Sequence, residues 1–169
     1  MSDTAVLVHV PEAEPLVGHW RLKHTYDAPL GIPAHVTLLF PWVQVDELSE
    51  DDEERLARLI AGTEPFDVMF ARTARFPDVL YLEPEPSQLF SALTAAIAAE
   101  WPEHPAYEGL HEAVVPHLTV AHGEDDLLER IRGEVEPRLP LRTRVSEAKL
   151  FVEDEAGRWQ ERTRLPFAS

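Results

Sequence analysis

The chain has 169 residues, 44% of them hydrophobic, a length and composition that suit one globular body with its own core. It contains no cysteine, which excludes disulfides, zinc–thiolate sites and thiol nucleophiles. The formal net charge is −16, and a strongly acidic protein repels a long polyanion, so we expect no long duplex nucleic acid as a partner. The first ten residues carry no basic region and no long apolar run, so we expect a cytoplasmic protein without a membrane anchor.

The spacing of apolar residues predicts seven strands and four helices. In chain order the expected elements are strand 4–10, helix 12–24, strand 35–40, helix 49–60, strands 66–76 and 79–82, helix 86–101, strand 114–121, helix 125–135, and strands 145–152 and 158–165. Turn-forming residues follow at Asp27–Gly31 and at Asp154–Gly157. Because hairpins replace long crossovers, the pattern favours an α+β fold built from antiparallel sheets.

The two halves of the chain repeat one order of elements: a strand containing His-x-Thr, an amphipathic helix, and a two-strand hairpin. No low-complexity linker separates the halves. We therefore expect residues 1–169 to form a single domain of two packed lobes, each of which contributes one His-x-Thr motif. We also expect the protein to be a monomer.

The repeated motif is the feature that points to chemistry. One copy lies in the segment Pro-Ala-His35-Val-Thr37-Leu-Leu-Phe and the other in Val-Pro-His117-Leu-Thr119-Val-Ala-His. Alternate residues of a strand share a face, so each histidine should point the same way as its threonine while the apolar neighbours enter the core. Chance would supply roughly a tenth of one full match in such a chain, which makes two copies at corresponding places informative.

Two histidines and two threonines suit the opening of a cyclic phosphodiester. One imidazole takes a proton from the attacking water or hydroxyl, and the other gives a proton to the leaving oxygen. The threonine hydroxyls donate to the non-bridging phosphoryl oxygens, where charge develops. This chemistry requires no metal and no cofactor, and it predicts a bell-shaped dependence of rate on pH with both limbs near neutrality. The acidic charge favours a small nucleotide or an RNA terminus with a cyclic phosphate as substrate.

The duplicated motif resembles that of the two-histidine (2H) phosphoesterase superfamily, most closely the bacterial branch of 2′,5′-RNA ligase-like or RNA 2′,3′-cyclic phosphodiesterase proteins. The resemblance extends from the strand near Ala5 to the hairpin that ends near Leu165. It implies a bilobed, pseudo-twofold arrangement of two antiparallel sheets with helices on the outer faces, a central cleft, and one motif on the central strand of each lobe.

The resemblance also implies an activity. It implies hydrolysis of 2′,3′-cyclic phosphates, generally to 2′-phosphates, with reversible 2′,5′-RNA ligation in some members. His35 and His117 would then be catalytic, and Thr37 and Thr119 would bind substrate. The same resemblance implies that His117 is the general base and His35 the general acid.

Two alternative functions, and the role of three aromatic residues, remain open from the sequence. One is a non-catalytic module of the same fold that binds a nucleotide or RNA end. A zinc-dependent hydrolase would need a cluster such as His111, Glu112, His117 and His122, although these spacings do not place the histidines on one face of a strand or helix. Finally, Phe40, Trp42 and Tyr81 are candidates for stacking on a base or for simple packing.

Overall fold

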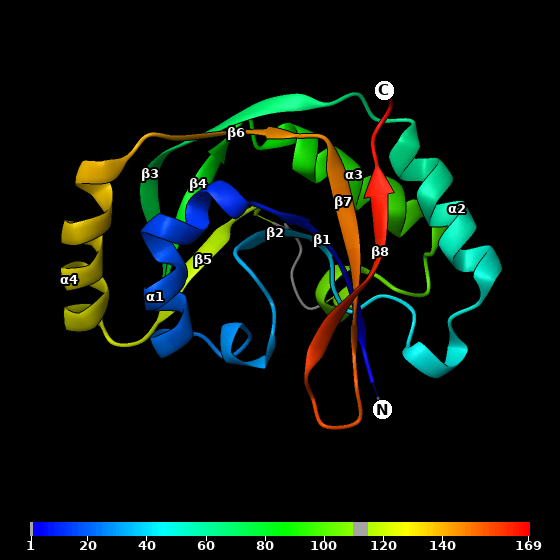
Figure 1. The fold of residues 1–169 in the computed structure, drawn as a ribbon, viewed down its shortest axis with the longest axis horizontal. Helices are drawn as coiled ribbons and strands as arrows, with labels where there is room; N and C mark the ends of the chain where they lie inside the picture. The colour runs from blue at the N-terminus through cyan, green and yellow to red at the C-terminus, as the bar shows by residue number, and fades with distance from the viewer. Residues whose placement is uncertain (1, 110–114) are drawn as a thin grey trace.

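The computed structural model describes residues 2–109 and 115–169 and contains two four-stranded antiparallel sheets (Figure 1). The first sheet has the strand order β2-β1-β7-β8, and the second has the order β5-β4-β3-β6. The strands are β1 (Thr4–His9), β2 (His35–Leu39), β3 (Phe66–Phe76), β4 (Val79–Glu85), β5 (Leu118–His122), β6 (Leu141–Val145), β7 (Glu147–Glu153) and β8 (Trp159–Pro166). The α+β fold with two antiparallel sheets is therefore as the sequence predicts.

Four α-helices pack against the sheets in two pairs. They are α1 (Glu14–His24), α2 (Glu50–Ala61), α3 (Gln88–Glu100) and α4 (Asp125–Val135). Helices α2 and α3 pack on the first sheet through β8 and β2, whereas α1 and α4 pack on the second through β5 and β4 (Figure 1). In the described part of the chain, no helix combines the length and the apolar character needed to cross a membrane.

The two halves of the chain are interleaved between the sheets. The hairpin β3–β4 follows β2 in sequence but pairs in the sheet of β5, and the hairpin β7–β8 pairs in the sheet of β2. Each sheet therefore combines a motif strand from one half with a hairpin from the other. The connecting helices also cross over, because α1 links β1 to β2 yet contacts β5, and α3 links β4 to β5 yet contacts β2.

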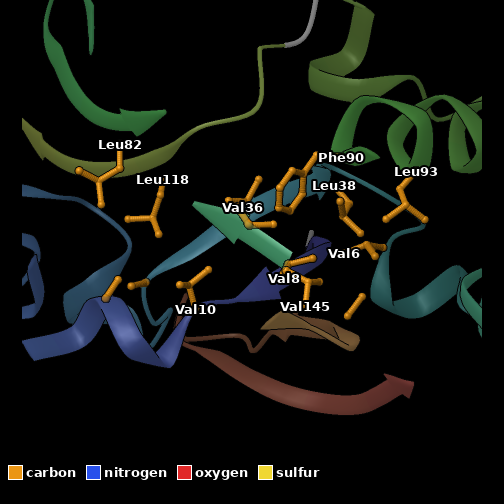
Figure 2. Close-up of a cluster of buried hydrophobic side chains, with 14 of the residues drawn as sticks. Val6, Val8, Val10, Val36, Leu38, Leu82, Phe90, Leu93, Leu118 and Val145 are labelled. Carbon is orange, nitrogen blue, oxygen red and sulfur yellow. The ribbon is translucent and has the colours of Figure 1, made fainter. Parts of the chain in front are cut away.

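One hydrophobic core joins both sheets. Strands β1 and β2 contribute fully buried side chains such as Val8, Val36 and Leu38, which lie with Phe90 and Leu93 from α3 (Figure 2). The same cluster contains Leu82 from β4 and Leu118 from β5 (Figure 2). The apolar residues of each motif strand thus enter the core, which leaves the alternate residues for the opposite face.

The structure differs from the sequence-based expectation in three places. Strand β6 is absent from that expectation, although its arginines alternate with Leu141, Thr143 and Val145 as in a half-buried strand, because only five residues carry the pattern. The strand expected at 114–121 begins only at Leu118, so His117 lies just before it; Val114 lies outside the described residues. The motif strands β2 and β5 are edge strands rather than central ones, and they lie beside each other.

Helix α2 begins with a complete capping box. The Ser49 hydroxyl accepts from the Asp52 backbone N–H at 3.0 Å, and the Asp52 carboxylate accepts from the Ser49 N–H at 3.2 Å. Four acidic residues occupy the first turn, where they interact favourably with the helix dipole. Such a cap satisfies backbone donors that otherwise have no partner in the helix.

We expect Ser49→Ala to lower the free energy of unfolding by about 1 kcal/mol, because it removes this cap. Denaturant unfolding followed by circular dichroism measures the change. Ser87→Ala is the matched control, since Ser87 precedes α3 in the same position but its side chain makes no capping bond. Equal losses in the two variants would contradict the role given to the Ser49 cap.

Candidate active site

His35 opens strand β2 and is almost completely buried, with 9% of its surface exposed. Its ring Nδ1 lies 2.7 Å from the carbonyl oxygen of Pro33. A carbonyl only accepts, so Nδ1 carries the proton and donates, and the neutral ring presents an unprotonated Nε2. That Nε2 lies 4.0 Å from Asp27 Oδ2.

His117 is held in the same way in the other half of the chain. Its Nδ1 donates to the carbonyl oxygen of Val115, two residues earlier, at 2.7 Å. The ring also packs edge-on against Phe76 and Tyr81, with centroid separations of 5.2 and 5.5 Å. The two histidines therefore have the same tautomer and the same hydrogen bond to the carbonyl two residues earlier. This shared geometry matches the repeat in the sequence.

Each motif strand carries a bulge immediately after its threonine. Leu7 pairs with Thr37 and Val6 with Leu39, so Leu38 is the extra residue in β2. Tyr81 pairs with Thr119 and Leu80 with Ala121, so Val120 is the extra residue in β5. Bulges redirect side chains and are frequent beside active sites. Both threonines are partly exposed on the side away from the core.

Burial controls the protonation of both rings. Desolvation lowers the pKa of His35 to about 4; the carboxylate of Asp27 opposes this shift, while the charges of Arg21 and His117 add to it. Desolvation also lowers the pKa of His117, against the hydrogen bond to Val115. The segments that carry the two rings adjoin, because strands β2 and β5 lie beside each other. Both rings are mainly neutral at pH 7.

Arg21 of α1 connects the two motif segments. Its guanidinium is buried, with 1% of the residue exposed, and donates to the Thr119 carbonyl of β5 at 2.7 Å. It also donates to Asp27 Oδ1 at 3.2 Å and to the carbonyls of Ile32 and Pro33 at 3.2 and 3.3 Å. The segment before His35 and the strand after His117 are therefore joined through one side chain.

Tyr107 extends the site on the side of Thr37. The side chains of Tyr107 and Thr37 are hydrogen-bonded to each other, and burial raises the pKa of the Tyr107 phenol. The Tyr107 backbone has a left-handed φ of 51°, and its N–H donates to the Phe40 carbonyl at 2.6 Å. A non-glycine residue in this conformation carries strain that its surroundings must offset. Tyr107 is thus fixed against the first motif strand.

A cavity of about 300 Å³ opens beside the first motif. Its walls combine both polar residues of that motif with aromatic and acidic side chains: Asp3, Ala5, Leu7, Tyr26, Asp27, Leu30, Ile32, His35, Thr37, Phe40, Glu153 and Trp159. None of these described lining residues is lysine or arginine. A larger hollow of about 680 Å³ lies beside the β7–β8 turn, but its lining contains neither motif. The smaller cavity is therefore the one associated with the candidate chemistry.

The turn that carries Asp27 is pressed against β8. Gly31 has a left-handed φ of 111°, and a Cβ there would lie 2.5 Å from the Trp159 carbonyl oxygen. Glycine is the residue that permits this approach. The turn thereby holds Tyr26 and Asp27 at the rim, where the Tyr26 ring also contacts His122 of β5 at a centroid distance of 4.9 Å.

The structure also bears on the other candidate residues. His111 and Glu112 of the conceivable zinc cluster lie outside the described residues, and within 2–109 and 115–169 no three His, Asp or Glu side chains are arranged to hold a metal ion. Trp42 is buried against Trp101, and Tyr81 packs on His117, whereas Phe40 lines the cavity next to Trp159.

Sequence reasoning missed several residues that the structure places at the site. Arg21 gives no signal, because a helical arginine is normally exposed. Asp27 has only the signature of a turn residue, and neither Tyr107 nor Trp159 belongs to a pattern. The motif residues that the sequence identifies remain the predicted catalytic and binding set, with His35 and Thr37 lining the cavity and His117 and Thr119 on the adjoining segment.

Solved structures share this fold across essentially the whole chain. LigT of E. coli, in a crystal structure with 3′-AMP, superposes with a TM-score of 0.66 at 17% identity and covers 99% of both chains. LigT with NADP+ gives a TM-score of 0.61 at 17% identity, covering 99% of this chain and 98% of that one. TT0787 of Thermus thermophilus gives 0.64 at 20% identity and 97% of both chains.

No curated protein is significantly similar in sequence to the chain. The family model described as the 2′-5′ RNA ligase superfamily, however, matches residues 9–157, a span that contains both motifs and the residues that join them. Its match agrees with the LigT-like arrangement of the two sheets. The chain therefore belongs to the 2′-5′ RNA ligase superfamily, the two-histidine phosphoesterases.

Proposed function

We propose that the protein is a metal-independent phosphodiesterase that opens 2′,3′-cyclic phosphates of nucleotides or RNA ends, with reversible 2′,5′-ligation as a further capacity of the same site. The observation that carries the proposal is the matched pair of imidazoles. His35 and His117 are anchored through Nδ1 to the carbonyl two residues earlier, and the segments that carry them adjoin at β2 and β5, where Arg21 bonds to both. Two such rings suit acid–base catalysis at a single phosphorus atom.

The mechanism assigns one proton transfer to each ring. His117 Nε2 takes a proton from water as the water oxygen bonds to phosphorus, and the bond from phosphorus to the 3′ oxygen breaks. His35 Nε2–H gives its proton to that oxygen, so the product is a 2′-phosphate and the protein ends with the proton moved from one ring to the other. Proton exchange with solvent restores the starting state. Thr37 and Thr119 donate to the non-bridging oxygens.

The acid role of His35 depends on the bound substrate. Its low pKa leaves it neutral in the free protein at pH 7. A phosphate anion placed beside the ring raises the pKa of the imidazole by attraction. The carboxylate of Asp27 already acts in this direction in the free protein. Binding of the phosphodiester therefore increases the fraction of His35 that is protonated at neutral pH.

The cavity supports a small nucleotide as substrate. Its volume of about 300 Å³ falls at the lower end of the range for small-molecule sites. Tyr26, Phe40 and Trp159 offer aromatic surface for a base, and the carboxylates can accept hydrogen bonds from amino and hydroxyl groups. The crystal structures of LigT with 3′-AMP, ATP and NADP+ show that a protein of this fold binds nucleotides.

We expect His35→Ala and His117→Ala each to lower kcat on nucleoside 2′,3′-cyclic phosphates at least ~100-fold, the usual contribution of a general acid or base. Turnover by the unaltered protein should persist in a chelator, because no step uses a metal. Product formation followed by chromatography in the presence of EDTA measures both effects. His19→Ala is the control, since that histidine is exposed on α1.

The outcomes separate the alternatives. Binding of cyclic nucleotides without turnover would support the binding module, and loss of turnover in EDTA that zinc restores would support the zinc hydrolase. Wild-type rates in either motif variant would overturn the assignment of the histidine pair.

We expect a bell-shaped pH dependence whose limbs differ between the two kinetic parameters. The profile of kcat/KM reports the free protein, where the pKa of both rings is lowered, so its limbs should lie on the acidic side of neutrality. The rate falls at low pH as the base is protonated and at high pH as the acid loses its proton. The kcat profile should lie at higher pH, because the bound phosphate raises both pKa values. A flat profile would contradict the mechanism.

We expect the activity on RNA oligomers to rise with salt, the reverse of the behaviour of a basic RNA-binding protein. A net charge of −16 and a carboxylate-lined cavity repel a polyanion, and added salt screens that repulsion. Rates on a cyclic mononucleotide and on a cyclic-phosphate oligomer, measured from about 20 to about 300 mM KCl, provide the comparison. A steep fall of the oligomer rate with salt would indicate a basic RNA-binding surface instead.

A further inference from the structure

We propose that Arg21 is the positioning residue of the histidine pair, and that its buried guanidinium, held by Asp27, fixes the two motif segments relative to each other. The inference rests on the proposed function, because it assigns a role in the reaction to a residue that does not itself carry out a proton transfer. It follows from the contacts that Arg21 makes on both sides of the junction between β2 and β5.

The guanidinium of Arg21 is placed where only hydrogen bonds can stabilise it. It is shielded from water, and such a charge is costly unless acceptors surround it. Asp27 supplies the one carboxylate, and the carbonyls of Ile32, Pro33 and Thr119 supply the remaining acceptors. The acceptors come from two segments that are far apart in sequence, so the side chain can be satisfied only when both are in place.

The hydrogen bonds of Arg21 act on each histidine through the backbone. The Pro33 carbonyl accepts both from Arg21 Nη2 and from His35 Nδ1, so the group that orients the His35 ring is itself held by Arg21. The Thr119 carbonyl lies on the edge strand β5, two residues after His117, where strand pairing on the β2 side gives it no partner. A change in the guanidinium therefore shifts both rings relative to one phosphorus atom.

The shape of arginine matters as much as its charge. Nη1 bonds to the second motif strand while Nη2 bonds to the loop before the first, a division that a planar fork permits. A lysine ammonium carries the same charge on a single atom and cannot reproduce that geometry. The Arg21→Lys variant therefore removes the connection and keeps the charge.

The activity test compares Arg21→Lys with Arg55→Lys. Displacing catalytic groups by about 1 Å costs on the order of 100-fold in rate, so kcat of Arg21→Lys should fall by this order. KM should change less than about threefold, because Arg21 is not among the residues that line the cavity. Arg55 bonds Glu100 between α2 and α3, away from both motifs, and its lysine variant should keep the wild-type kcat.

A second test reads the histidine directly in the protein without substrate. The charged and titratable groups that face the His35 ring are Asp27 from the turn before β2, Arg21 from α1, and His117 from the segment before β5. Arg21 lowers the pKa of His35 and Asp27 raises it. In an NMR titration of the ring, Arg21→Gln should therefore raise the pKa of His35, and Asp27→Asn should lower it.

A merely structural role of Arg21 and Asp27 cannot shift the pKa of His35 in opposite directions in the two variants. Loosening of the site would admit water in both variants, relieve the desolvation that dominates the shift, and raise the pKa of His35 in both. Circular dichroism verifies that each variant is folded, and Arg21→Lys provides a second case in which the charge is kept. Parallel shifts, or a wild-type kcat in Arg21→Lys, would overturn the proposal.

The two proposals fail in different ways. If the unaltered protein does not open cyclic phosphates, the proposed function fails, while the titration of His35 still reports whether Arg21 and Asp27 set its environment. If the protein is active and Arg21→Lys matches it in kcat, only the positioning role fails.

Discussion

The structure depends on hydrogen bonds that helix side chains donate to the unpaired edge strands of the two sheets. Each of these helices comes from the opposite half of the chain to the strand that it holds. Strands β2 and β5 each have one side without a strand partner, and each carries a reactive motif. Unpaired carbonyls on a buried edge must find donors elsewhere. Arg21 of α1 donates to the Thr119 carbonyl, and the Thr94 hydroxyl of α3 donates to the Leu38 carbonyl at 2.6 Å. Each motif strand is thus held by a side chain from a helix that links two strands of the other sheet.

This arrangement explains how two edge strands can hold the motif side chains in fixed positions. A bulge follows each threonine, and each histidine is tied to a carbonyl two residues before it. The apolar residues of the same strands are buried in one shared core, which fixes the position of both strands relative to that core. The side of β2 that faces the cavity carries the polar residues of the first motif, and α3 and α1 pack beside the two edge strands.

Local patterns predict much of this structure but not the groups that connect it. Helix α4 occupies Asp125–Val135 as its apolar spacing predicts, and Ser49 caps α2 as its residue type suggests. The bulges have no comparable local signal, because they depend on the register with a pairing partner. Arg21 and Asp27 are ordinary surface residues when judged by composition. Their importance arises only where the turn, the helix and β5 meet, through contacts between distant parts of the chain.

The interleaving of the sheets has a consequence for synthesis on the ribosome. Strand β1, at Thr4–His9, lies between β2 and β7 (Glu147–Glu153), and β8 completes that sheet at Trp159–Pro166. A nascent chain can close the β3–β4 hairpin early, but the sheet that holds His35 waits for β7 and β8, which are synthesised long after β1 and β2. Each sheet combines strands from both halves of the chain, and pairing of such distant segments is a slow step in folding. Nascent chains should therefore expose the unpaired edge of β1 to chaperones until β7 has emerged from the ribosome.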